Sequence, residues 1–223
     1  MSVVLHLGDC RDLIDGVLDG LSNVVIVSDP PFNIGYHYGV CTDDMEDGEY
    51  WGMMRKVFGQ DPCAVVHYPE ALHRLTLELG RVPDKVCSWV YNSNTPRQHR
   101  DVAYYGVMPD MTRMTQPYKN PGDRRVRRLI AEGRTGGRLY DWWNVNQVKN
   151  VSSEKLDHPC QMPLEVMCDI VGVLPEDCTV VIRSWARGRP GRPSSGSTRP
   201  RGRPGASSAS RWTRPTSGRR PAG

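Results

Sequence analysis

The seven cysteines of this sequence form no Cys-x-x-Cys pair, and their number is odd. Both facts argue against a zinc site and against the disulfide framework of a small secreted protein, so we expect reduced thiols and a cytoplasmic location. Long apolar runs are also missing, since no stretch approaches the roughly 18 residues that a membrane-spanning helix needs. The N-terminus has no basic segment ahead of an apolar one, which argues against a secretory signal. The sequence therefore predicts an intracellular protein with no membrane segment and no metal.

Acidic residues are absent from the last 41 residues, Arg183 to Gly223, which carry 11 Arg together with 8 Ser, 7 Gly and 6 Pro. Residues 1–182 hold the other 18 basic residues and all 25 acids, so the formal net charge of +4 combines a body of −7 with a tail of +11. A segment with so few apolar side chains cannot form a core. The 223 residues thus predict one domain over 1–182 and a disordered Arg/Pro/Ser/Gly tail over 183–223.

Short apolar runs alternate with segments of helical periodicity in the first part of the chain. Runs typical of buried strands cover residues 3–7, 23–27, 64–68 and 86–91, and helical spacing covers 13–21, 48–60 and 70–79. A further helix is predicted over 163–174 and a strand over 177–181. This alternation predicts an α/β fold in which helices cover both faces of a parallel sheet.

The periodicity weakens between residues 92 and 150, which favours a segment inserted into the domain and not woven into its sheet. Basic side chains gather there, interleaved with tyrosine and tryptophan. Guanidinium groups position phosphates and also bind guanine edges in the major groove, so DNA contact is one interpretation and a solvated charged loop is the other. The candidate DNA-binding residues are Arg97, Arg100, Arg113, Lys119, Arg124, Arg125, Arg127 and Arg128.

The sequence Asp29-Pro30-Pro31-Phe32 lies directly after a predicted buried strand. The two prolines end strand pairing and leave a rigid exit, at the kind of strand end where parallel sheets bind ligands. An enzyme that acts on the exocyclic amine of a base needs acceptors for the amine hydrogens and a flat partner that holds the base outside the duplex. Asp29 and the Pro30 carbonyl can supply the acceptors, and Phe32 the flat partner. The alternative is a simple turn with a core phenylalanine.

Three blocks of the chain resemble motifs of the DNA amino-methyltransferases that modify adenine N6 or cytosine N4, in the permuted class whose catalytic motif lies near the N-terminus. The blocks are Leu5–Cys10 (LHLGDC), Asp29–Ile34 (DPPFNI) and His158–Pro163 (HPCQMP), and the resemblance covers residues 3 to about 181. It implies a Rossmann-like methyltransferase fold, S-adenosylmethionine as the methyl donor and double-stranded DNA as the partner. It also implies that residues 92–150 hold the target-recognition region.

Residue by residue, the resemblance implies roles at both ends of the site. Asp29, Pro30, Pro31 and Phe32 match the catalytic DPPY/F loop, with Phe32 in the stacking position. Asp in the first place of this loop is commoner among adenine N6 enzymes, so adenine is favoured over cytosine. A companion nuclease, the recognition sequence and the oligomeric state are left open.

The remaining matches concern the cofactor. Asp9, with Cys10 beside it, matches the acid that the family places near the cofactor adenine, although a helix N-cap is the simpler interpretation of Asp9. Cys160 and Met162 stand where the family motif HPTQKP has Thr and Lys. The residues that match the motif at the methionine end of the cofactor are His158, Cys160 and Gln161, and His158 has the alternative of an ordinary turn residue.

The family's glycine-rich cofactor loop, of the type DPFxGSGTT after a strand, is missing after Val181, where residues 182–191 read IRSWARGRPG. The codons ATC CGT TCA TGG GCT CGG GGA CGA CCG GG after a G read DPFMGSGTTG when translation starts one nucleotide earlier. The glycine encoded across TGG and GCN needs no choice of codon. We therefore predict a reading-frame slip at Val181/Ile182 with the tail as its out-of-frame product; the alternative is an evolved basic arm.

The sequence as a whole predicts a site-specific, S-adenosylmethionine-dependent adenine N6 methyltransferase of double-stranded DNA, impaired by loss of the glycine-rich loop. Three alternatives stay open: a non-catalytic DNA-binding remnant, a cytosine N4 methyltransferase, and a methyltransferase of RNA or of protein amines.

Overall fold

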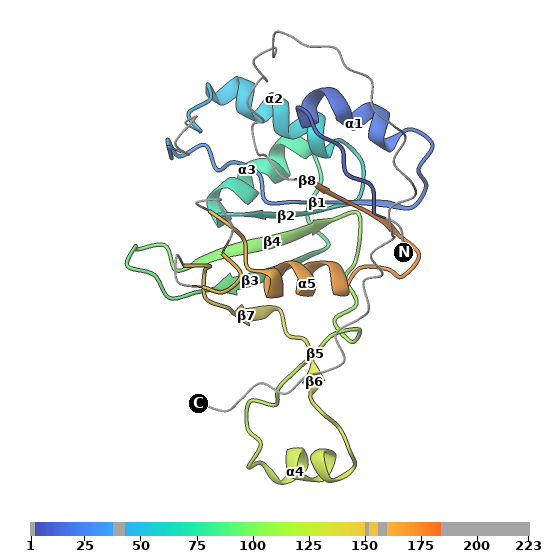
Figure 1. Ribbon diagram of the computed structural model, residues 1–223, viewed down its shortest axis with the longest axis vertical. Coiled ribbons are helices and arrows are strands. Elements are labelled where there is room, and N and C mark those ends of the chain that lie inside the picture. The colour runs from blue at the N-terminus through green and yellow to red at the C-terminus, as the bar shows by residue number, and fades with distance from the viewer. Residues whose placement is uncertain (1–2, 38–42, 150–151, 156–159, 184–223) are drawn as a thin grey trace, which may run out of the picture.

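A six-stranded sheet forms the centre of the computed structural model, which describes residues 3–37, 43–149, 152–155 and 160–183 (Figure 1). The strand order is β7-β3-β4-β2-β1-β8. Strand β4 is antiparallel to both of its neighbours, and every other neighbouring pair is parallel, so all strands except β4 run in one direction. This confirms the predicted α/β class with a mainly parallel, Rossmann-like sheet. The strands are β1 Val24–Ser28, β2 Cys63–His67, β3 Lys85–Val90, β4 His99–Tyr105, β7 Trp142–Asn144 and β8 Thr179–Arg183.

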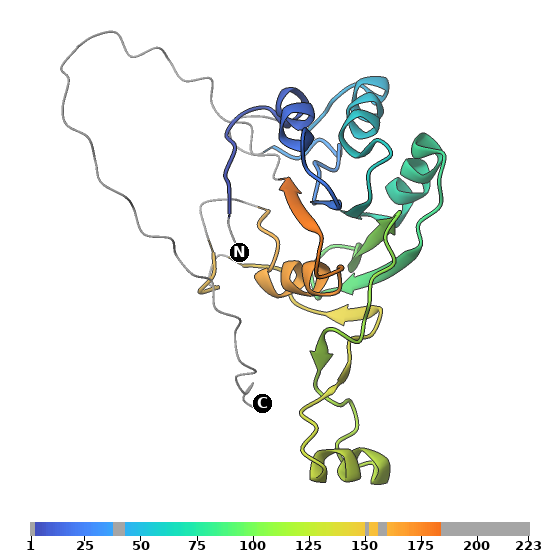
Figure 2. The same cartoon turned by 90° about the vertical axis from the view of Figure 1, so that its right-hand side faces the viewer.

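Helices cover both faces of the sheet (Figure 2). Side chains alternate between the two faces along a strand, and in β1 Ile26 packs toward α2 and α3, whereas Val25 and Val27 pack toward α5. Both faces are therefore buried, which explains why these strands are continuous apolar runs. The helices are α1 Cys10–Leu18, α2 Asp47–Phe58 and α3 Pro69–Leu79 on one face and α5 Leu164–Gly172 on the other.

Local signals set the ends of these helices. The Asp9 side chain accepts the Arg11 backbone N–H and caps α1. Helix α3 begins at Pro69, whose missing N–H costs nothing at a first helical position, and ends at Gly80 in the left-handed region with φ 63°. The bounds of α3 agree closely with the predicted range 70–79, whereas α1 begins and ends three residues earlier than the predicted range 13–21.

Residues 3–7 do not form the predicted strand. Their apolar side chains are instead exposed, with Val3 at 80%, Leu5 at 92% and Leu7 at 96%. A strand needs a partner for its backbone hydrogen bonds, and β8, the last strand of the described sheet, pairs only with β1.

The segment 92–150 is also more closely tied to the sheet than expected. Residues 99–105 form β4 between β3 and β2, and residues 142–144 form the edge strand β7. What lies outside the sheet is a long arm between these two strands. It consists of β5 (Thr115–Gln116), β6 (Gly137–Arg138) and α4 (Arg124–Ala131).

The arm projects away from the sheet and carries α4 at its far end (Figures 1 and 2). Strands β5 and β6 pair as a short antiparallel stalk. At Gly136 a Cβ atom would lie 2.4 Å from the backbone oxygen of Gln116, so only glycine allows the two chains of the stalk to approach this closely.

No helix within the described ranges is both long and apolar enough to cross a membrane. The predicted disordered tail lies outside the described residues, apart from Arg183 at the end of β8.

Replacing Ile170 by Ala should test the α5 face of the core. Ile170 is fully buried, so the substitution removes apolar contacts and leaves a cavity, and we expect the free energy of unfolding to fall by about 2–5 kcal/mol in urea denaturation. Leu164 on the same helix is 57% exposed, and Leu164→Ala should cost at most about 0.5 kcal/mol. Equal losses for the two variants would contradict the packing of α5.

Candidate active site

The Asp29–Phe32 corner lies where several strands place polar and aromatic side chains at one edge of the sheet. Strand β1 ends immediately before it, β2 ends at His67 with Tyr68 following, and β3 ends just before Tyr91. Strand β4 runs the other way, so its first residues, including Arg100, reach the same edge. The topology thus brings residues from four strand ends around the predicted catalytic loop.

A series of hydrogen bonds through His67 and Tyr50 fixes the diproline corner. The Tyr68 backbone N–H donates to His67 Nδ1 at 2.7 Å, so the other ring nitrogen, Nε2, carries the proton. Nε2 lies 2.9 Å from the Tyr50 hydroxyl, which donates in turn to the Pro31 carbonyl at 2.8 Å. Burial, helped by nearby guanidinium groups, lowers the pKa of His67 to about 3 and keeps the ring neutral. The Pro31 carbonyl is therefore committed to the scaffold.

Two further side chains hold the loop that follows. The buried carboxylate of Asp43 accepts the backbone N–H groups of Phe32, at 3.2 Å, and of Tyr36. Asn33 has φ 53°, in the left-handed region, and exchanges two hydrogen bonds with the Met45 backbone, at 3.0 and 2.7 Å. Asparagine tolerates this conformation better than most residues, and here its side chain also ties the loop to the start of α2.

Asp29 has a buried oxygen atom without a partner. Its Oδ1 accepts no hydrogen bond within the part of the chain that the structure describes. Burial raises the pKa of Asp29 from 3.8 to about 6, and the positive charge of Arg100 acts in the opposite direction. The carboxylate is thus mostly ionised at neutral pH, and its buried Oδ1 atom is an unused acceptor among the described residues, although Asp29 as a whole is only partly buried.

Phe32 lies in a cluster of aromatic and cationic side chains. Its ring centroid is 4.7 Å from that of His67 and 4.9 Å from that of Tyr68, in both cases tilted. The Arg100 guanidinium lies over the Phe32 ring at 4.5 Å, and Arg97 lies over Tyr68 at 4.4 Å. The expected stacking residue is therefore at the edge of the sheet, with a guanidinium plane already against it.

The structure places Asp9 as a helix cap, which is the simpler of the two interpretations that the sequence allows. In addition to the cap hydrogen bond, its carboxylate forms an ion pair with the Arg11 side chain at 2.7 Å. Burial raises the pKa of the neighbouring Cys10, and the charge of Arg183 opposes this, so the LHLGDC block lies near the end of β8.

The HPCQMP block reaches the corner through one of its residues. His158 lies outside the described residues. Cys160 interacts with the Tyr36 side chain and feels the charges of Arg100 and Asp29, so it lies beside the corner. The Gln161 side-chain amide donates to the Glu154 carbonyl at 2.7 Å, which ties down the preceding loop.

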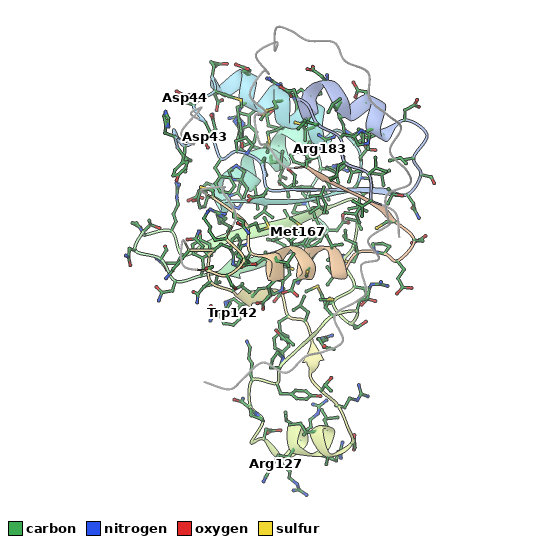
Figure 3. All side chains as sticks on the ribbon, in the orientation of Figure 1. Asp43, Asp44, Arg127, Trp142, Met167 and Arg183 are labelled. Carbon is green, nitrogen blue, oxygen red and sulfur yellow. The ribbon has the colours of Figure 1, made fainter. Side chains whose placement is uncertain are left out.

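The eight candidate DNA-binding residues have different surroundings. Arg124, Arg125, Arg127 and Arg128 are exposed on α4, and Figure 3 shows Arg127 at the far end of the arm. Lys119 lies over the exposed Trp142 ring at 4.4 Å.

Two members of this set interact with the domain itself. Arg113 forms an ion pair with Glu176 at 3.0 Å and donates to the Gly172 carbonyl, so it attaches the arm to the end of α5. Arg100 is only 8% exposed, because β4 is a central strand and not part of an inserted loop. The buried Arg100 side chain is therefore not placed to meet the outer surface of a duplex, whereas Arg113 is exposed and its DNA contact stays a prediction.

Sequence reasoning missed three residues that build the site, Asp43, Tyr50 and His67, and it named Arg100 for DNA contact and not for the inward position that the structure shows. His67 and Tyr68 end a correctly predicted strand at the carboxyl edge, which is a usable signal. Asp43 and Tyr50 act through contacts across 11 and 19 positions of the chain, and no local pattern indicates them.

Two further observations concern the described structure outside this site. A surface hollow of about 430 Å³ lies at the opposite edge of the sheet, where Val24, Pro62 and Val107 line it together with other, mainly apolar, residues. Among the described residues, no three His, Cys, Asp or Glu side chains gather as a group that could hold a metal ion.

No protein-family model and no curated protein sequence matches the chain. A solved structure, described as the crystal structure of an M1.HpyAVI-SAM complex, is similar at 15% sequence identity with a TM-score of 0.43, over 79% of this chain and 80% of that one. A likeness this distant assigns neither an activity nor a ligand to the present chain.

Replacing Asp29 by Asn should stabilise the protein at neutral pH. The pKa of Asp29 is raised in the folded state, so its charged form is penalised above about pH 6, and the penalty disappears below the ordinary pKa of 3.8. The pKa difference corresponds to a gain on the order of 3 kcal/mol in the free energy of unfolding at pH 7–8. Urea denaturation at a series of pH values measures it, and the same gain at pH 4 as at pH 8 would contradict the burial of this carboxylate.

Proposed function

We propose that the chain is a DNA amino-methyltransferase that transfers a methyl group from S-adenosylmethionine to the N6 amine of adenine in double-stranded DNA. The observation that carries this proposal is the rigid Asp29–Phe32 corner, with an unpaired, buried Asp29 oxygen and an aromatic ring next to it. The adenine preference rests on the Asp in the first place of the motif, and cytosine N4 is the alternative base.

The corner can hold an amine in the geometry that methyl transfer needs. Asp29 Oδ1 and the Pro30 carbonyl accept the two amine hydrogens, which leaves the nitrogen lone pair directed toward the methyl donor. The acceptors belong to a loop that is fixed by the Tyr50 hydrogen bond to Pro31, so they do not have to reorganise during the reaction. No covalent intermediate with the protein is required.

The cofactor end fits S-adenosylmethionine incompletely. The guanidinium of Arg183, the last residue of β8, is buried, and both of its Nη atoms lack a partner among the described residues. A buried cation disfavours the positively charged sulfonium of this cofactor. Asp9 is engaged by Arg11. We therefore expect this chain to bind the cofactor weakly.

The polarity at the end of β8 supports the reading-frame slip. Ile182 is apolar but 55% exposed, whereas Arg183 is charged but only 6% exposed. An exposed position favours a polar residue and a buried position an apolar one, so the two residues are the reverse of the expected pair. In the alternative frame, Asp replaces Ile182 and Pro replaces Arg183, so the polar residue becomes the exposed one. The exposed apolar residues 3–7 also lack a partner in the described sheet, as expected if later strands are missing from the printed frame.

The function is tested by expressing the printed chain and a frame-restored chain in cells without DNA methylation. In the restored chain, DPFMGSGTTG follows Val181. We expect this chain to produce N6-methyladenine at one recurring sequence, measured by nucleoside mass spectrometry and by mapping of methylated bases. The printed chain should give a small fraction of this signal, and Asp29→Ala in the restored chain should abolish it while the protein remains folded.

Other results of this experiment distinguish an adenine N6 methyltransferase from a cytosine N4 methyltransferase and from a non-catalytic remnant. A folded, frame-restored protein that methylates no base would contradict the proposal. Methylation at cytosine N4 would keep the chemistry of the corner and overturn the adenine preference. The buried Arg183 favours a non-catalytic remnant for the printed chain, and calorimetric titration that detects no S-adenosylmethionine binding to this chain alone would support that candidate.

Helix α4 supports a role of the arm in DNA contact. The helix contains four arginines and no acid, and its N-cap Asp123 accepts the Arg125 and Val126 N–H groups. None of its residues is buried, so the charge has no use in packing. An exposed helix with this charge, held away from the sheet, suits binding to phosphates of a duplex groove.

Replacing the α4 arginines by glutamine should weaken DNA binding and its salt dependence. The slope of log K against log salt concentration should fall by up to about 0.9 per lost phosphate contact, as measured by fluorescence anisotropy with duplex DNA. The four substituted positions are Arg124, Arg125, Arg127 and Arg128.

A matched control removes the same charge from the other end of the molecule. It carries glutamine at Arg11, Arg55, Lys56 and Arg74, on or near α1 to α3. An equal change of slope in both variants would show that only net charge matters and would contradict a binding role for the arm. The arginine-rich tail is present in both, so it does not affect the comparison.

A further inference from the structure

Arg100 is the only arginine of β4, and its side chain is surrounded by aromatic rings. The guanidinium carbon lies 4.5 Å from the ring centroid of Phe32, 5.3 Å from that of Trp89 and 5.8 Å from that of Tyr91. Contacts with aromatic faces compensate part of the cost of burying this cation. They leave its N–H donors uncompensated unless they find acceptors.

One of these donors is unpaired. Arg100 Nε is buried and has no hydrogen-bond partner within the described part of the chain. Asp29 Oδ1, in the loop that carries Phe32, is a buried acceptor that also has no hydrogen-bond partner among the described residues. An unpaired buried polar group typically costs about 1–3 kcal/mol, so two of them around Phe32 point to a ligand that supplies both partners.

The two groups are electrostatically coupled. The Arg100 charge lowers the pKa of Asp29 against the larger effect of burial, and it also acts on Cys160 from the HPCQMP block. Among the described residues Asp29 Oδ1 accepts no hydrogen bond, so the guanidinium acts on Asp29 through its charge, and its own Nε–H has no partner there either. The site thus contains one unpaired donor and one unpaired acceptor that are close enough to interact electrostatically.

We propose that Arg100 is a base-reading residue: its Nε–H donates to the ring nitrogen that adjoins the exocyclic amine of the target base, while Asp29 accepts a hydrogen of that amine. This inference rests on the proposed function. Adenine offers the required pair as N6–H and N1, and cytosine offers it as N4–H and N3. Thymine has an N–H at the corresponding ring position, next to a carbonyl oxygen, so both partners would be mismatched. Guanine is mismatched in the same way at its N1–H and O6 edge, and its amine N2–H and ring N3 pair lies beside the substituent on N9, which hinders approach.

The inference is tested by titrating free bases into the purified full chain. The signals to follow in nuclear magnetic resonance spectra are the Arg100 Nε–H group and the Phe32 ring. Saturation with 9-methyladenine or 1-methylcytosine should move the Arg100 Nε–H resonance to lower field, and 9-methylguanine and 1-methylthymine should leave it unchanged. An analogue that keeps the amine but has carbon in place of N1, 9-methyl-1-deazaadenine, should bind wild-type protein about tenfold more weakly than 9-methyladenine, the expected order for one lost hydrogen bond to a charged donor.

Arg100→Lys keeps the charge but removes the Nε–H, so this variant should bind the two adenine analogues with nearly equal affinity. Arg138→Lys is the control, because Arg138 is exposed on β6, outside the Asp29–Phe32 corner, and this variant should retain the tenfold difference. If Arg100→Lys does not fold, the comparison of the two analogues on wild-type protein still decides the question.

The outcomes separate this inference from the proposed function. If 9-methyladenine moves the Phe32 signals but leaves the Arg100 Nε–H signal unchanged, the base-reading role of Arg100 is wrong, and binding of the base at the Asp29–Phe32 corner is supported. If no base moves either signal at saturating concentration, both proposals are contradicted. Equal affinity of wild-type protein for 9-methyladenine and its 1-deaza analogue would overturn the role of Arg100 alone.

Discussion

The site depends on one constraint: the Oδ1 atom of the partly buried Asp29 carboxylate is held in a buried position where no part of the described chain supplies a hydrogen bond. Such an arrangement destabilises the charged group, as the raised pKa indicates, and it persists only because the surrounding contacts fix the backbone. The Pro31 carbonyl is held from one side by Tyr50, and the Phe32 N–H is held from the other by Asp43. The loop therefore cannot relax to give Asp29 a partner.

This arrangement follows from how the sheet is built. Parallel β1 and β2 end at the same edge, and antiparallel β4 starts there, so a single edge collects an acid, an imidazole and a guanidinium. The imidazole of His67 is neutral and serves the scaffold, and the guanidinium of Arg100 remains charged beside the acid. Free energy lost at Asp29 and Arg100 is offset by the apolar layers on the two faces of the sheet.

Much of the fold could be predicted from the sequence, because buried parallel strands are short apolar runs and their covering helices have regular periodicity. The corner was located for the same reason, since Pro30 and Pro31 mark the end of a strand. Strand β4 was missed because its first residues, from His99 to Asp101, are polar, and its burial comes from tertiary pairing. Residues 3–7 have the composition of a strand, but composition does not supply a pairing partner. The scaffold side chains of the site lie far apart in the chain, so no spacing rule reveals them.

The central claim is most directly tested by the ionisation of Asp29 itself. Carbon-13 nuclear magnetic resonance of the aspartate carboxyl groups, assigned by loss of one signal in Asp29→Asn, measures its pKa in the intact chain. A carboxylate near one guanidinium, with a buried Oδ1 atom that has no partner among the described residues, predicts a value of about 6. A value near the ordinary 3.8 would show that the carboxylate is solvated or directly paired, and would contradict the account of the corner as a preformed acceptor for a base amine.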